Sequence, residues 1–484
     1  MLFNSIQFAV FFPIVTVLFF LLPQRARVPL LLAASCVFYM VFIPKYILIL
    51  ALLIVVDYSA GLLIDRNRAG RRRAFLLLSL CANLGILGFF KYFNFFNNNI
   101  AALARFLDWN YSIDHLRIIL PIGLSFHTFQ SMSYTIEVYR DKVPAERSLL
   151  HFALYVMFYP QLVAGPIERP QNLLHQFREY HRFSWANFTQ GMQLMATGFF
   201  KKLIIADGIS VVVNTVYAKP AEHSGMQLLI ATWLVAIQIY CDFAGYTEIA
   251  RGAAKVIGFD LMLNFNRPYL ATSMVGFWRR WHISLSTWFR DYVYIPLGGN
   301  RGTLVRTSIN LAIVFLISGF WHSANWTFVV WGALHAFFVV AYVLSEAPRA
   351  RLKQAARGWG AALTTFLSWL LTFNLVSFAW IFFRAANMHD AMLIVRRVFT
   401  DLRWSGIGEF HPGLDSLQFA VAMTVIGLLA LLEVINTRTP VWALIDRQPR
   451  WARWTAYYAI GIAFVVLLLL GPRQGPQPFV YFQF

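Results

Sequence analysis

Two histidines in apolar surroundings are the side chains of this sequence best suited to chemistry. His322 follows an almost unbroken apolar run from Asn310 to Trp321, so its ring is expected at depth in a membrane domain. Ionisable groups at that depth are costly to bury and tend to be functional. A neutral imidazole in a water-poor pocket can act as a general base, taking the proton of a hydroxyl that attacks an acyl carbonyl. The alternative role for the same ring is a helix–helix hydrogen bond.

The neighbours of His322 at helical spacing favour a cavity beside its ring. Ser318 and Gly319 fall one turn before it and Asn325 falls one turn after it. The small residues leave room, and the Asn325 amide is placed to orient the imidazole. His335, in the next apolar run, is expected to be structural.

The second histidine, His282, lies within the segment Phe277–Arg301, FWRRWHISLSTWFRDYVYIPLGGNR. Residues 277–290, taken as one helix, carry their large apolar side chains on one side, at Trp278, Trp281, Leu285 and Trp288. This profile predicts an interfacial helix, with His282 on the inward face and its ring pointing into protein. The alternative is an interfacial histidine that is hydrogen-bonded to a backbone carbonyl.

The elements that must position these residues are membrane helices. Of 484 residues, 59% are hydrophobic and only 13% are charged, whereas soluble chains carry about 25% charged residues. A span needs roughly 17–25 apolar residues. We therefore expect an all-α polytopic membrane protein with ten to twelve crossings and a single domain over residues 1–484.

Thirteen apolar runs are candidates for these crossings. The clear ones are Ile6–Leu22, Ile47–Ile64, Phe75–Phe93, Ile118–Val138, Met192–Val213, Trp326–Leu344, Trp359–Phe383, Leu417–Ile435 and Ala456–Leu470. The shorter ones, which are either short spans or buried re-entrant helices, are Val28–Phe42, Phe152–Gly165, Leu228–Phe243 and Ile309–Trp321. The segment 159–170, YPQLVAGPIERP, contains three prolines and must leave regular helix. Such backbone at membrane depth usually lines a cavity.

Charge patterning indicates topology and not nucleic-acid binding. The formal net charge is +19, but the basic residues occupy short loops between apolar runs. Basic residues after the first and third runs assign those loops to the cytoplasm and the N-terminus to the outside. The N-terminal run lacks the flank and cleavage site of a secretory signal, so it is expected to remain as a membrane helix.

Several enzyme classes are disfavoured by what the sequence lacks. It contains no G-x-x-x-x-G-K-[ST] phosphate loop, no G-x-S-x-G nucleophile elbow and no H-E-x-x-H metal site. ATP hydrolysis, serine hydrolysis and zinc chemistry are therefore not expected, and no metal ligands are predicted.

Several segments together resemble one known family. They are YPQLVAGPIERP, QIYCDFAGYTEIARG, NFNRPY, FWRRWHISLSTWFRDYVYIPLGGNRG, GFWHSANWTFVVWGALHA and the terminal FVYFQF. The chain is similar to the membrane-bound O-acyltransferases and, among them, most similar to the bacterial alginate O-acetyltransferase branch. The resemblance implies a multi-helix enzyme of the bacterial inner membrane with a central funnel or tunnel. It also implies that His322 is catalytic and that His282 is a second active-site residue.

The resemblance also implies a donor, an acceptor and partners. The acyl group would come from a cytoplasmic thioester, acetyl-CoA, as substrate and not as a tightly bound cofactor. It would pass towards the outer face for O-acetylation of an exported polysaccharide such as alginate. A periplasmic serine-type acetyltransferase and polysaccharide-export proteins would be the partners. In this interpretation His322 is the general base, and His282 either orients the donor or polarises its carbonyl.

A wider set of residues is expected to bind substrate or donor: Arg279, Arg280, Trp278, Asn325 and Asp242. The two arginines belong to a stretch from Arg267 to Arg306 with six arginines and one acid, which favours an anionic ligand. Asp242 either lines an aqueous path or pairs with another charge.

Two other functions remain open from the sequence. A transporter could use Asp57, Asp242, Glu248 and the two histidines as a relay, although the chain shows no repeated halves. A non-catalytic scaffold of a polysaccharide-export complex is the other alternative.

The arginine pair supplies a test of donor binding. Replacing both Arg279 and Arg280 with glutamine should raise the apparent KM for the acyl donor, because the anionic parts of coenzyme A would lose their cationic partners. Steady-state kinetics over a range of donor concentrations measures this, and an unchanged KM would exclude the pair from that role.

Overall fold

The computed structural model describes residues 1–67, 70–116, 120–163, 165–403, 410–472, 477 and 479. Helices are the regular elements of these residues, and no strand occurs among them. The all-α prediction is therefore confirmed. Most of the terminal FVYFQF motif and the beginning of the predicted Ile118–Val138 run lie outside the described residues.

Eight helices of the described part are long and apolar enough to cross a membrane. They are η1–α3 (Pro44–Arg66), α4–η2–α5 (Arg72–Phe106), α11 (Gly225–Val256), α14 (Leu304–His322), α15 (Trp326–Leu344), α17 (Trp359–Arg384), α19 (Ser416–Ile435) and α21 (Arg450–Leu470). The apolar helix α1 (Ile6–Leu21) is shorter. A polytopic membrane protein is thus confirmed, while the figure of ten to twelve crossings stays a prediction.

Helix α11 corrects one sequence prediction. The apolar run Leu228–Phe243 was expected to be a short span or a re-entrant helix, but the helix has 32 residues and continues to Val256. Its second half contains acidic residues that lower its hydropathy. Asp242 and Glu248 form ion pairs with Lys202 and Lys201 at 2.6 Å. Because each buried carboxylate has a lysine partner, the helix can include both acids.

The chain divides into two compact units. Unit 1 comprises residues 1–195, 249–263 and 323–325, and unit 2 comprises residues 196–248, 264–322 and 326–484. The further helices of unit 1 are α2 (Gln24–Met40), α6 (Leu124–Tyr139), α7 (Leu149–Met157) and α8 (Pro170–Leu173). Those of unit 2 are α10 (Asp207–Ala218), α12 (Met274–Trp278), α13 (Ile283–Phe289), α16 (Glu346–Ala355), α18 (Met388–Thr400) and α20 (Val441–Asp446). Helix α9 (Trp185–Phe199) begins in unit 1.

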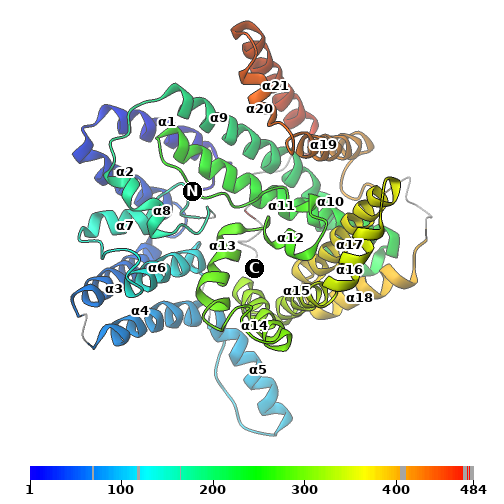
Figure 1. Ribbon diagram of the computed structural model, residues 1–484, viewed down its shortest axis with the longest axis horizontal. Helices are drawn as coiled ribbons and strands as arrows, with labels where there is room; N and C mark the ends of the chain where they lie inside the picture. The colour runs from blue at the N-terminus through cyan, green and yellow to red at the C-terminus, as the bar shows by residue number, and fades with distance from the viewer. Residues whose placement is uncertain are drawn as a thin grey trace. The chain divides into compact units, whose positions relative to one another are not determined.

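Helices α3, α4 and α6 of unit 1 pack against one another (Figure 1). Asp57 of α3 is fully buried between them. Its carboxylate accepts hydrogen bonds from Ser79 at 2.6 Å, from Asn83 at 2.9 Å and from Ser131. Buried carboxylates need such donors, and these bonds make Asp57 a structural residue of the three-helix contact.

The chain after α7 leaves regular helix, as the prolines predict. Every described residue of 158–168 is buried, although none belongs to a helix. Non-helical backbone at membrane depth is tolerated where protein covers it. The carboxylate of Glu168 accepts hydrogen bonds from the Met262 backbone N–H at 2.5 Å and from Asn172 Nδ2 at 2.7 Å. Burial raises the pKa of Glu168 to about 7.

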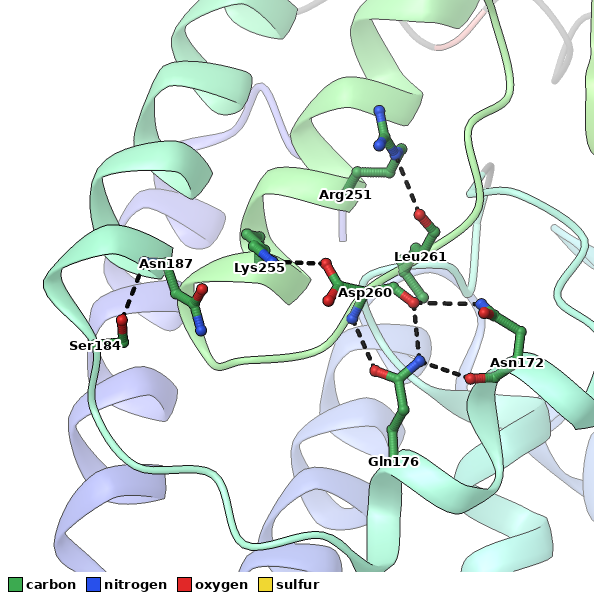
Figure 2. Close-up of polar contacts among 8 residues, drawn as sticks. All are labelled: Asn172, Gln176, Ser184, Asn187, Arg251, Lys255, Asp260 and Leu261. Carbon is green, nitrogen blue, oxygen red and sulfur yellow. Dashed lines mark hydrogen bonds and ion pairs between the residues drawn. The ribbon is translucent and has the colours of Figure 1, made fainter. Parts of the chain in front are cut away.

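The segment that follows α11, around Asp260, is held by hydrogen bonds to side-chain amides of unit 1 (Figure 2). Gln176 accepts a hydrogen bond from the Asp260 backbone N–H at 2.8 Å and donates one to the Asp260 carbonyl at 3.0 Å. Lys255 pairs with the Asp260 carboxylate at 2.8 Å, and Arg251 donates to the Leu261 carbonyl. Because both backbone groups of Asp260 are held, this segment is fixed directly before the chain enters unit 2 at Asn264.

Helices α14 and α15 of unit 2 lie side by side (Figure 1). Gly319 and Gly332 allow this approach, because a Cβ built on Gly319 would lie 3.2 Å from the Gly332 Cα atom. A Cβ built on Gly332 would lie 2.5 Å from the Phe315 carbonyl oxygen. Small residues at such contacts let helix backbones pack closely in membranes. Both glycines are therefore required where they stand.

The glycine contact generates a stability prediction. Gly332→Ala should destabilise the protein by about 1–3 kcal/mol, because rigid backbone atoms, not flexible side-chain ends, meet the new methyl group. Thermal unfolding in detergent or nanodiscs measures the change.

Gly427→Ala is the matched control. Nothing lies within 4 Å of a Cβ at Gly427 of α19, so the same substitution should be neutral or slightly stabilising. Equal melting temperatures for the two variants would contradict the close-packing interpretation.

Candidate active site

His322 is the last residue of α14, and its side chain is buried, with 6% exposed. Its ring lies edge-on to Trp331 of α15, with centroids 5.2 Å apart, and to Phe383 of α17 at 5.6 Å. Three packed helices therefore define the position of the imidazole. The ring of His322 is thus buried among aromatic side chains, while its depth in a membrane stays a prediction.

Trp331 connects His322 to a second group of aromatic rings. Its centroid lies 5.9 Å from that of Trp278 and 4.7 Å from that of His335. His335 is fully buried, and within the described chain neither of its ring nitrogens has a hydrogen-bond partner. Trp278 thus contacts Trp331, which in turn contacts His322, while the predicted donor-binding role of Trp278 stays a prediction.

The prediction of one helix over residues 277–290 is wrong. Helix α12 ends at Trp278 and α13 begins at Ile283, with His282 between them in the left-handed region at φ +43°. The break follows from hydrogen bonds that a continuous helix could not make. The Asn264 carbonyl accepts from the Ile283 N–H at 2.8 Å, and the Arg280 carbonyl accepts from the Asn266 N–H at 2.9 Å.

The side chain of His282 points into the protein, as predicted, and only 1% of it is exposed. Its ring lies 4.7 Å from that of Phe243, and its Nδ1 atom lies 3.2 Å from Asn264 Oδ1. Burial lowers the pKa of His282 to about 3. The ring is therefore neutral across the physiological pH range. A non-glycine residue in this backbone region stores about 1–3 kcal/mol of strain, a feature common at functional sites.

An aromatic chain joins the two histidines within unit 2. Trp331, which contacts His322, lies 5.8 Å from Trp380 of α17. Trp380 lies 5.1 Å from Trp281, the residue that precedes His282. Both imidazoles thus belong to one tryptophan-rich interior, which can exclude water from a reaction.

The other predicted residues have different environments. Arg279 is exposed and Arg280 is half-buried on the chain between α12 and α13. Asn325 is half-buried in the turn between α14 and α15. These positions leave the predicted donor-binding roles of the three residues untested.

Asp242 belongs to a network of buried charges on α11. Lys202 lies 2.6 Å from Asp242 and 2.8 Å from Asp207, and Lys201 lies 2.6 Å from Glu248. Both lysines belong to the π-helix η4 (Phe200–Ala206), which approaches α11 so closely that a Cβ built on Gly245 would lie 3.0 Å from the Lys202 backbone nitrogen. Opposite charges in this geometry account for the burial of Asp242. Its predicted substrate contact stays a prediction.

Sequence reasoning missed several residues of this interior. Asn264, which holds His282, stands in the NFNRPY motif but carried no predicted role. The signal for Lys201 and Lys202 was available, since two lysines in an apolar run require acidic partners. Trp331 and Trp380 gave no signal, because tryptophans are frequent in the spans of this chain.

The site contains imidazole rings that are suited to proton transfer. In the part of the chain that the structure describes, no group of three or more His, Cys, Asp or Glu side chains is placed to hold a metal ion. A neutral imidazole that is surrounded by aromatic side chains can accept a proton from a reacting hydroxyl.

Comparison with known sequences gives a family match. The model of the MBOAT, membrane-bound O-acyltransferase family matches residues 75–383. A probable alginate O-acetylase AlgI of Pseudomonas aeruginosa is 39% identical over 449 residues, which cover 90% of this chain and 82% of that protein.

Two further relatives carry different names. A peptidoglycan O-acetyltransferase of Helicobacter pylori is 35% identical over 87% of this chain and 83% of its own length. A teichoic acid D-alanyltransferase of Bacillus subtilis is 27% identical over 56% of this chain and 70% of its own length. The three names share acyl transfer and differ in the polymer.

The buried neutral state of His282 predicts a pH-dependent stability. In the unfolded chain the pKa returns to its ordinary value of 6.5, so the unfolded state binds the proton first. The free energy of unfolding should therefore fall as pH decreases from 6.5 towards 3, by at most about 1.4 kcal/mol per pH unit from this residue. His282→Asn, which tolerates the left-handed backbone, should show a shallower loss in thermal unfolding between pH 7 and pH 4.

His175→Asn is the control, because the His175 side chain is 59% exposed. That variant should keep the wild-type slope. Parallel slopes for wild type and His282→Asn would contradict the buried neutral ring.

Proposed function

The chain belongs to the membrane-bound O-acyltransferase family, and on that premise we propose that it transfers an acetyl group for O-acetylation of an exported polysaccharide. It is an acyltransferase and a multi-pass membrane protein. The donor that we propose is acetyl-CoA on the cytoplasmic side of a bacterial inner membrane. The group moves towards the periplasm, where a serine-type acetyltransferase and export proteins complete the process.

The observation that carries this proposal is the position of His322. Its ring ends α14 against Trp331 and Phe383, in the same aromatic interior as His282. An imidazole held among apolar side chains is suited to general base catalysis. The exclusion of water by these side chains protects a thioester from hydrolysis.

The proposed reaction balances without a cofactor. His322 takes the proton of an acceptor hydroxyl while the hydroxyl oxygen attacks the thioester carbonyl. A C–O bond forms and the C–S bond breaks, and the imidazolium returns its proton to the departing thiolate. The ester and the free thiol leave His322 in its starting state.

The polymer is proposed from the relatives. Two relatives are named for O-acetylation of alginate and of peptidoglycan, and their similarity extends over most of this chain. Their shared chemistry supports an acetyl group and a polysaccharide acceptor, with alginate as the first candidate.

The transporter alternative has a weaker basis in the structure. Asp57 is held by Ser79, Asn83 and Ser131, whereas Asp242 and Glu248 are paired with lysines. These local partners account for the burial of each acid without a relay.

The proposed function predicts the result of a complementation experiment. In a deletion strain, the wild-type gene should restore O-acetyl groups on envelope polysaccharides and His322→Ala should not, because the general base is lost. Ester-linked acetate is measured in each polysaccharide fraction, after equal membrane abundance of the two proteins is confirmed.

His389→Ala is the matched control, since His389 is exposed on α18, and it should restore acetylation fully. Full restoration by His322→Ala would reject catalysis by that residue and favour the scaffold or transporter functions.

A further inference from the structure

We infer that Asn264 is a positioning residue for His282, which it fixes in the tautomer that presents a lone pair on Nε2 to the reactants. The inference rests on the proposed acyl transfer and deepens it, because it decides which of two roles His282 can play.

Asn264 is fully buried and holds the chain around His282 through both its side chain and its backbone. Its Oδ1 atom accepts hydrogen bonds from the Ser284 N–H at 3.2 Å and from Ser284 Oγ at 2.9 Å. Its backbone carbonyl accepts from the Ile283 N–H at 2.8 Å. The two residues that follow His282 are therefore anchored to one asparagine.

The orientation of the Asn264 amide is determined by its partners. A backbone N–H can only donate, so the atom that faces the Ser284 N–H must be the oxygen and not the nitrogen. The amide nitrogen then lies 3.5 Å from Thr247 Oγ1. The Thr247 hydroxyl donates its own proton to the Phe243 carbonyl at 2.9 Å, which leaves its oxygen available as an acceptor.

The amide oxygen in turn determines the tautomer of His282. Asn264 Oδ1 lies 3.2 Å from His282 Nδ1, and an amide oxygen can only accept. Nδ1 must therefore carry the proton, and in the neutral ring the lone pair resides on Nε2. Burial keeps the ring neutral by lowering its pKa to about 3.

The backbone of His282 explains why such an anchor is needed. A residue at φ +43° is retained only when its surroundings enforce that conformation. The bonds from Asn264 to Ile283 and Ser284 provide this constraint at the first turn of α13. The same asparagine thus sets both the direction and the proton of the imidazole.

This tautomer separates the two roles that the sequence left open for His282. A lone pair on Nε2 accepts a hydrogen bond, so it can orient an N–H or O–H group of a reactant. It cannot donate a hydrogen bond to a thioester carbonyl. The geometry therefore points to orientation of a reactant and not to polarisation of the carbonyl.

The test compares two substitutions at Asn264 by the pH dependence of kcat/KM. Thiol release from acetyl-CoA is followed between pH 5 and pH 9 in nanodiscs supplied with alginate, the first candidate acceptor, at matched protein abundance. Asn264→Leu removes the side-chain acceptor Oδ1, leaves the backbone carbonyl in place, and should lower kcat/KM about tenfold or more at each pH.

Asn264→Asp keeps the acceptors and adds a negative charge beside Nδ1, which favours the imidazolium. This variant should retain activity at alkaline pH. The titration of His282, which a pKa of about 3 keeps below the measured range in the wild type, should move up by about 2 pH units or more, so that the variant loses activity at the acid end of the range. A merely structural role would not move that titration.

Asn266→Asp and Asn266→Leu are the matched controls, because the Asn266 side chain is exposed two residues away. Both should reproduce the wild-type profile. If the wild type is active, an unchanged pH profile in Asn264→Asp or full activity in Asn264→Leu would overturn this inference and leave the proposed function standing. An inactive wild type would contradict the proposed function as well.

Discussion

The contact between Gly319 and Gly332 is the constraint on which the site depends. It brings α14 and α15 so close that a methyl group on Gly332 would meet the Phe315 carbonyl at 2.5 Å. His322 follows Gly319 by less than one turn, and Trp331 directly precedes Gly332. The glycine contact therefore sets the position of the imidazole against the indole that packs on it. Without close packing here, the ring of His322 would face lipid or water instead of aromatic protein.

The protein buries polar groups in two different ways. Lys201 and Lys202 are compensated by acids at 2.6 Å, which fastens the π-helix η4 to α11 in a charged network. His282 and Asn264 form a neutral network, in which each donor meets an acceptor and burial keeps the ring unprotonated. The first arrangement fixes a helix contact, while the second leaves a neutral imidazole that can accept a hydrogen bond from a reactant. This difference explains why the histidines, and not the buried acids, are the better catalytic candidates.

The sequence predicted the parts of this structure that depend on composition and local pattern. Apolar runs coincide with the eight candidate spans, and the bounds of the Trp326–Leu344 helix were found without error, although the run Met192–Val213, predicted as a clear crossing, is not among these spans in the described residues. The prolines of 159–170 predicted the loss of helix there. Periodicity failed at His282, because long-range hydrogen bonds from Asn264 and Asn266 break the helix that Trp278, Trp281 and Leu285 suggested. Hydropathy ended the predicted α11 run at Phe243, because Glu248 lowers the hydropathy beyond that residue, and its partner Lys201 lies on another helix.

The central claim is that this chain moves an acetyl group from a cytoplasmic thioester to the other side of the membrane with His322 as the base. The most direct measurement uses inverted membrane vesicles supplied on the outside with acetyl-CoA that carries a labelled acetyl group. The account predicts that label accumulates in the lumen as alkali-labile ester with the wild-type protein and stays at background with His322→Ala. Equal luminal label for the two proteins would contradict it.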